Sequence, residues 1–153
     1  MHVISKVMPE HDEIYSAWLP HRPPWDLLSR IVDWDGIKIL AEMYVSPELP
    51  FLTGHFPDRP VTPGVVILEG LTHAGAMLVF LNHPERKDSG VALAKVEKVL
   101  FKEALFPPVL ATLLVTLKRE GRGLYFFEGT VRVDQKVVAT AEFVGGAVNW
   151  KDR

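Results

Sequence analysis

The strongest constraint on the fold of this chain is a nineteen-residue apolar stretch, from Pro63 to Leu81, that carries Glu69 and His73 near its middle. The stretch is long enough for a membrane span, but a carboxylate in such a span costs about 2.5–3.5 kcal/mol on insertion scales. Its apolar residues also recur every three or four positions, which is the helical period. We therefore predict a long helix buried in a protein core, and no membrane span.

The segments before this helix read as a short helix, a hairpin and a loop. A short helix is plausible over Asp12–Leu19, ahead of three closely spaced prolines. Residues Ile31–Val45 form two apolar arms around Asp35 and Gly36, a pair typical of a tight turn. Ser46–Pro63 holds too many prolines for regular structure, so we expect a loop there.

Four strands are predicted after the helix. In the third of them the residue types alternate, so one face should pack on a core and the other should face outward. A helix this apolar needs cover on all sides, which predicts an α+β fold with an antiparallel sheet around the helix, in one domain spanning 1–153. The predicted strands are Val91–Phe101, Val109–Leu117, Leu124–Val133 and Val137–Val148, and in the third Tyr125, Phe127, Val131 and Val133 share the core face.

Composition excludes several classes of function. Seventeen Lys and Arg stand against nineteen Asp and Glu, so the chain lacks the positive field of a nucleic-acid binder. Without cysteine it has no disulfide, no thiolate nucleophile and no Cys-ligated metal. The first thirteen residues lack the basic start and apolar run of a signal peptide. We expect a cytoplasmic protein.

One run of residues carries a specific resemblance. Gly54-His55-Phe56-Pro57, continuing through Pro63-Gly64-Val65 to Leu68-Glu69-Gly70, resembles the signature of the β-hydroxyacyl-acyl-carrier-protein dehydratases, which have the hotdog fold. Leu19-Pro20-His21-Arg22 upstream and Phe101-Lys102 downstream are similar to further segments of that family. The resemblance spans roughly Ile14 to Val144, which is nearly the whole chain.

The resemblance implies a function and a set of site residues. The family's catalytic histidine falls on His55, its catalytic carboxylate on Glu69, and its thioester-polarising backbone N–H on Gly64. It implies dehydration of 3-hydroxyacyl thioesters to trans-2-enoyl thioesters on acyl carrier protein, in fatty-acid or related polyketide-like synthesis and with no cofactor. Because the family pairs the histidine of one subunit with the glutamate of another, it also implies a homodimer or a trimer of dimers.

The chemistry of these residue types supports the assignment. Loss of water from a 3-hydroxyacyl thioester needs a base for the α-proton, an acid for the β-hydroxyl and a donor for the enolate-like oxygen. His55 suits the base, and Gly64 at the start of the helix offers a first-turn N–H. For Glu69 on the apolar helix we expect burial to raise the pKa, which favours the acid.

Other residues around Glu69 leave alternatives open. Glu69 could instead form a structural ion pair with Arg22, Arg30 or Arg59. His73, one turn further along the helix, could hold the Glu69 carboxyl or simply pack in the core. Glu69, His73 and His55 lack a metal-binding pattern, so no metal is predicted.

The chain departs from the family pattern at three places. Ser29 stands where an aspartate is usual, His73 where a glutamine is usual, and Pro107-Pro108-Val109 where Pro-Gly-Asp is usual. None of these changes removes a catalytic group. They leave open two other functions, a hotdog acyl thioesterase and a non-catalytic partner subunit of an active dehydratase.

Overall fold

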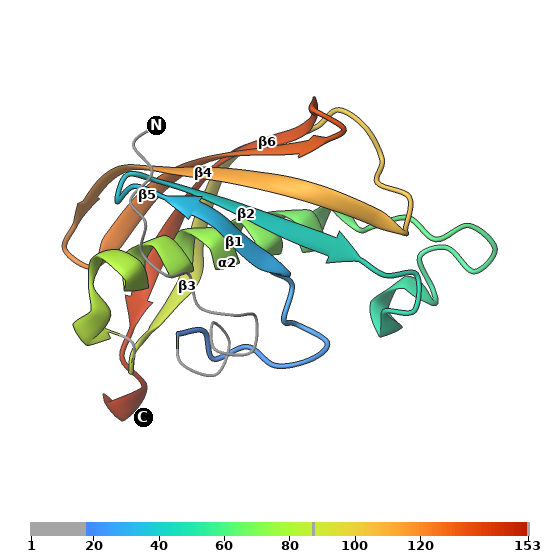
Figure 1. Ribbon diagram of the computed structural model, residues 1–153. Coiled ribbons are helices and arrows are strands. Elements are labelled where there is room, and N and C mark those ends of the chain that lie inside the picture. The colour runs from blue at the N-terminus through green and yellow to red at the C-terminus, as the bar shows by residue number, and fades with distance from the viewer. Residues whose placement is uncertain (1–17, 87, 153) are drawn as a thin grey trace.

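A computed structural model describes residues 18–86 and 88–152 of the chain. One long helix, α2 (Gly64–Asn82), lies along the concave side of a curved antiparallel sheet (Figure 1). The helix has thirteen buried residues. It is apolar and long enough for a membrane span, yet 72% of its apolar window is buried inside the molecule. It is therefore a core helix, as predicted.

The sheet has six strands in the order β1-β2-β4-β5-β6-β3. In this order β1 and β3 are the two edge strands. Every neighbouring pair is antiparallel. This is the wrapped-helix α+β architecture that the sequence predicted. The strands are β1 (Arg30–Trp34), β2 (Lys38–Val45), β3 (Gly90–Phe101), β4 (Val109–Gly121), β5 (Leu124–Val133) and β6 (Lys136–Val148), and three short 3-10 turns lie at η1 (Pro50–Leu52), η2 (Pro84–Arg86) and η3 (Trp150–Asp152). The helix contacts β4 in the middle of the sheet, β2 toward one edge, and β6 and β3 at the other edge.

The β1–β2 hairpin turns where the sequence predicted. Gly36 has a φ of 88°, which a glycine adopts without strain. The Asp35 carboxylate accepts hydrogen bonds from the backbone N–H groups of Lys38 at 2.8 Å and Ile37 at 3.0 Å. These bonds stabilise the charged form, so the pKa of Asp35 lies below its ordinary value.

Strand β5 confirms the predicted alternation. Tyr125, Phe127 and Val131 are buried against the helix side of the sheet, Val133 is half-buried, and Glu128 is exposed on the other face. Strand β4 continues four residues beyond the predicted end at Leu117, because the β4–β5 ladder runs on to the turn at Arg122 and Gly123.

Two sequence predictions for the first half of the chain have different outcomes. Most of the short helix expected over Asp12–Leu19 lies outside the described residues. The expected loop over Ser46–Pro63 is confirmed, with only the single turn η1 inside it. That loop leads directly into α2 and therefore fixes where His55 lies relative to the start of the helix.

Candidate active site

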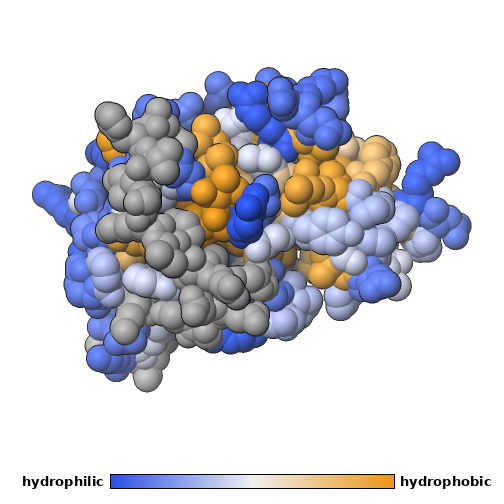
Figure 2. Space-filling view, in the orientation of Figure 1, coloured by the Kyte–Doolittle hydropathy of each residue, from blue (hydrophilic) through white to orange (hydrophobic). Residues whose placement is uncertain are grey.

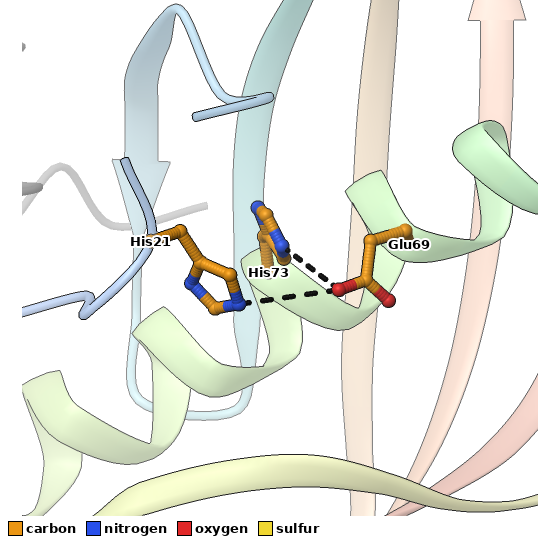
Figure 3. Close-up of side chains that lie close together, drawn as sticks. All are labelled: His21, Glu69 and His73. Carbon is orange, nitrogen blue, oxygen red and sulfur yellow. Dashed lines mark hydrogen bonds and ion pairs between the residues drawn. The ribbon is translucent and has the colours of Figure 1, made fainter. Parts of the chain in front are cut away.

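Helix α2 places Glu69 and His73 one turn apart on the same side. The Nε2 atom of His73 lies 3.1 Å from Oε1 of Glu69, at hydrogen-bonding distance (Figure 3). His73 is 1% exposed and the Glu69 side chain 32% exposed, so a fully buried imidazole holds a carboxylate that reaches the surface. The contact that the sequence left open is therefore present in the fold.

A third side chain completes this cluster. His21 lies in the segment before β1, and its Nε2 atom is 3.9 Å from Oε1 of Glu69. Its ring packs on the ring of His73, with 3.8 Å between centroids. The Arg22 guanidinium donates to the carbonyl oxygens of Leu19 and His21, which helps to hold this segment.

His21 lies within a segment similar to the family's, but no chemistry was predicted for it. We call His21, Glu69 and His73 the His–Glu–His cluster (Figure 3). The motif containing His21 was the available signal, but forty-eight positions of chain separate it from Glu69. Their proximity is a consequence of how the segment before β1 crosses α2.

The pKa values of His21 and Glu69 are both lowered in the cluster, which contradicts the prediction made for Glu69. Burial, followed by the neighbouring His73 ring, lowers the pKa of His21 to about 4. The pKa of Glu69 is also lowered, chiefly because it accepts the His73 hydrogen bond, which outweighs the opposing effect of burial. The expectation that burial raises this pKa was wrong, since the sequence did not supply the strength of that hydrogen bond.

The loop before α2 fixes the His55 ring. Its Nδ1 atom lies 2.7 Å from the carbonyl oxygen of Val61, and the Val61 N–H donates to the His55 carbonyl at 2.8 Å. Because a carbonyl oxygen can only accept, Nδ1 carries the proton in this hydrogen bond. The neutral ring then has its lone pair on Nε2, the form that a general base requires.

His55 and Gly64 line the same cavity. The cavity holds about 300 Å³ and lies between the loop, the start of α2 and the end of β3. Gly64 begins the helix, so its N–H is a first-turn donor at the positive end of the helix dipole. The Phe101 ring packs so closely that a Cβ built on Gly64 would lie 2.8 Å from it. Any larger residue at position 64 would crowd the Phe101 ring, whereas glycine leaves the helix N–H accessible from the cavity. The cavity is lined by His55, Val61, Thr62, Gly64, Ile67, Phe101, Lys102, Glu103, Ala104 and Leu105.

Within one chain, therefore, the predicted site falls into two parts. His55 and Gly64 share the cavity, whereas Glu69, further along α2, is not among the residues that line it. Glu69 belongs instead to the His–Glu–His cluster. That the histidine and the glutamate of one site come from different subunits stays a prediction.

The arginines considered as partners for Glu69 have other roles. Arg30 forms a two-pronged ion pair with Glu42, at 2.9 and 3.0 Å. Arg59 is exposed, and its backbone exchanges hydrogen bonds with that of Phe56 inside the His55 loop. The position of Arg59 thus supports the shape of that loop rather than the surroundings of Glu69.

Two of the three departures from the family pattern lie at strand ends. The hydroxyl oxygen of Ser29 accepts a hydrogen bond from the Tyr44 N–H at 2.8 Å, where β1 begins beside β2. Pro107-Pro108-Val109 leads into β4. Both changes therefore affect loop ends, and only His73 lies in contact with a predicted catalytic side chain.

Several solved structures share the fold of this chain. The dehydratase heterocomplex ApeI:P from Xenorhabdus doucetiae matches with a TM-score of 0.77 at 20% identity, covering 89% of this chain and 91% of that one. A Haemophilus influenzae thioesterase matches with a TM-score of 0.58 at 17% identity, covering 78% of each chain. At these identities the likeness establishes the hotdog fold.

Sequence comparison identifies the family. The model of the FabA-like domain matches residues 19–142, so the chain belongs to the FabA-like family. The 3-hydroxyacyl-[acyl-carrier-protein] dehydratase FabZ of Xylella fastidiosa (strain M23) is 36% identical over 136 residues, covering 86% of this chain and 85% of that relative. FabZ of Coxiella burnetii (strain RSA 331 / Henzerling II) is 38% identical over 130 residues, covering 83% and 92%.

Proposed function

We propose that this chain dehydrates 3-hydroxyacyl thioesters, carried on acyl carrier protein, to trans-2-enoyl thioesters in cytoplasmic fatty-acid synthesis. It does so as a single hotdog domain. The observation that carries the proposal is the shared cavity of His55 and Gly64, in which a base with a fixed tautomer stands beside a helix N-terminal donor. The FabZ relatives support the substrate class.

The reaction follows from these groups. The Nε2 atom of His55 takes the α-proton, and the electrons of the broken C–H bond delocalise toward the thioester oxygen. The Gly64 N–H stabilises the charge that develops there. The β-carbon–oxygen bond then breaks, Glu69 supplies a proton to the departing hydroxyl, and water leaves as the double bond forms.

Glu69 must hold a proton for this step, although its pKa is lowered in the single chain. A second subunit and a bound acyl chain would both remove water from a carboxyl that is 32% exposed here. Desolvation disfavours the charged form and raises a carboxyl pKa. We infer that assembly and substrate binding together bring Glu69 to its acid form.

The exposed edge of the sheet supports a dimer. Among the described residues, strand β3 pairs only with β6, and most of its twelve residues are exposed. Among them are the apolar side chains of Val96, at 42% exposure, and Leu100, at 52%. A long apolar edge with unpaired backbone groups is a template for another strand. A second copy of β3 is the occupant that this edge fits best.

The start of α2 adds to the same surface. Val65 is 74% exposed although most of its helix is buried, and Phe101 at the end of β3 is exposed beside Gly64. Figure 2 shows further apolar patches between hydrophilic surroundings on the face in view. We propose that the dimer covers Val65 and the β3 edge, and brings the His55 cavity of one subunit to Glu69 of the other.

Activity and product analysis test this function. The purified protein should hydrate a crotonyl thioester, which is the reverse reaction. His55→Ala and Glu69→Gln should each lower kcat by at least about a hundredfold, the low end of what a placed acid or base contributes. Wild-type rates in both variants would refute the assignment.

The same assay separates the alternatives. Release of free acid and thiol would establish a thioesterase, a function found on the same fold in the Haemophilus influenzae relative. An inactive protein that becomes active only with a second dehydratase chain would establish a partner subunit. The Xenorhabdus doucetiae structure with this fold is described as a dehydratase heterocomplex.

A further inference from the structure

The His–Glu–His cluster has the composition of a metal site. One nitrogen from each histidine and one carboxylate oxygen of Glu69 all lie within 4.8 Å of one another. Among the residues that the structure describes, no other group of three such side chains converges in this way. The sequence offered only two neighbouring ligands on α2, and the fold supplies His21 as the third.

We propose that the His–Glu–His cluster binds a divalent transition-metal ion of the zinc class, through the Nε2 atoms of His21 and His73 and the carboxylate of Glu69. Two imidazoles and one carboxylate suit Zn²⁺, Co²⁺ or Ni²⁺, whereas Mg²⁺ and Ca²⁺ prefer oxygen ligands. The fourth position would be left for water, as in sites with three protein ligands.

The distances from Glu69 to the two histidines suit one bound ion. Zinc bonds to nitrogen and oxygen are about 2.0–2.2 Å long, so the ligands of one ion lie up to roughly 4 Å apart. The His73–Glu69 distance of 3.1 Å and the His21–Glu69 distance of 3.9 Å lie within that limit. His21, whose side chain is 25% exposed, has the freedom to complete the approach.

The second nitrogen of each ring is compatible with metal binding at Nε2. The Nδ1 atoms of His21 and His73 are buried, and neither has a hydrogen-bond partner among the described residues. In His73 the hydrogen bond to Glu69 places the proton on Nε2. An ion at Nε2 would replace that bond, and the proton would move to Nδ1, so that Nε2 presents its lone pair to the ion. An ion would enter the cluster from solvent past the partly exposed Glu69 and His21 side chains, since His73 is fully buried.

Occupancy would have a defined effect on catalysis. A metal ion on the Glu69 carboxylate keeps that group deprotonated, so it cannot donate a proton to the leaving hydroxyl. The ion would therefore act as a reversible inhibitor. This consequence rests on the proposed function, whereas binding of the ion does not.

A surface histidine provides the matched control. His83 contacts Glu120 through Nε2, at 3.1 Å, and Glu85 through Nδ1, at 3.6 Å. The two carboxylates therefore lie on opposite sides of the ring and do not converge on one ion. His83→Gln removes a partly exposed histidine beside two carboxylates without touching the cluster.

The binding test uses untagged full-length protein with Co²⁺ and Zn²⁺. We expect one ion per chain by equilibrium dialysis, and intense visible bands of four- or five-coordinate Co²⁺ that Zn²⁺ abolishes. His21→Gln and His73→Gln should each weaken Co²⁺ binding by at least about tenfold, while His83→Gln leaves it unchanged. Because His21 is partly exposed, His21→Gln remains informative even where His73→Gln fails to fold.

The results of these experiments support or overturn the metal site and the acid role of Glu69 separately. Equal Co²⁺ binding in the wild type and His21→Gln, or loss of binding in His83→Gln alone, would overturn the site. Zn²⁺ should inhibit crotonyl thioester hydration by the wild type, and a chelator should restore the activity. Mg²⁺ should not inhibit. Binding without inhibition would retain the metal site and count against the acid role of Glu69, so the two proposals can fail separately.

Discussion

The shared active site makes a quantitative prediction for mixed subunits. His55→Ala leaves a chain that can contribute only Glu69, and Glu69→Gln leaves one that can contribute only His55. Equal amounts that exchange at random give half of all dimers as mixed pairs. Each mixed dimer contains one site with both native residues and one with neither. About a quarter of all sites, and hence about a quarter of wild-type activity, should be recovered.

The assay is hydration of a crotonyl thioester after the two variants have been incubated together. Each variant alone should retain no more than about 1% of wild-type kcat, so recovery to a quarter is a rise of roughly twenty-five-fold or more. Native mass spectrometry follows the exchange, because the two variant chains differ in mass. A trimer of dimers gives the same fraction, since the sites are shared within each dimer.

A second mixture serves as the control. Wild-type chains exchanged with a His55→Ala/Glu69→Gln double variant form mixed dimers in which every site lacks one group. Activity should then fall from about one half, before exchange, to about one quarter after it. If mass spectrometry shows complete exchange and neither mixture changes, each chain contains its own site and the proposed arrangement is wrong.

Three further predictions concern single residues. Gly64→Ala places a methyl group 2.8 Å from the present Phe101 ring position, so it should lower kcat/KM in thioester hydration while thermal unfolding shows the fold retained. His73→Gln keeps a hydrogen-bond donor for Glu69 and should retain most activity. His73→Leu removes the donor and should lower kcat by up to about a hundredfold. Equal kcat values in these two variants would show that His73 only packs. The pKa of Asp35 is lowered by folding, so its stabilisation is present at neutral pH and is lost as pH falls through its folded pKa. Asp35→Ala should therefore lower Tm more at pH 7 than at roughly pH 2, and an equal loss at both would contradict this account.

The sequence predicted the architecture because its signals are local. The period of α2, the alternation in β5 and the Asp35-Gly36 turn each depend on residues close together in the chain, and each is confirmed. The motif around His55 is local in the same way, and the catalytic role of His55 stays a prediction.

The surroundings of Glu69 could not be predicted in full. The His73 contact follows from helical spacing, but the approach of His21 depends on how a distant segment crosses α2. The direction of the Glu69 pKa depends on a competition between burial and a hydrogen bond, and only the geometry decides it. Burial alone predicts a raised pKa for Glu69, which is the wrong direction.

The exposed β3 edge links the enzyme's activity to its concentration. If two β3 strands join, the surface that completes the site is also the surface that a newly made chain leaves uncovered. Dilution would then separate subunits and abolish turnover without unfolding them, and Tm would rise with protein concentration. During synthesis the same edge would be open to mispairing until a second chain arrives, so a cell that makes too little of this protein would have fragile, inactive monomers rather than a small amount of enzyme.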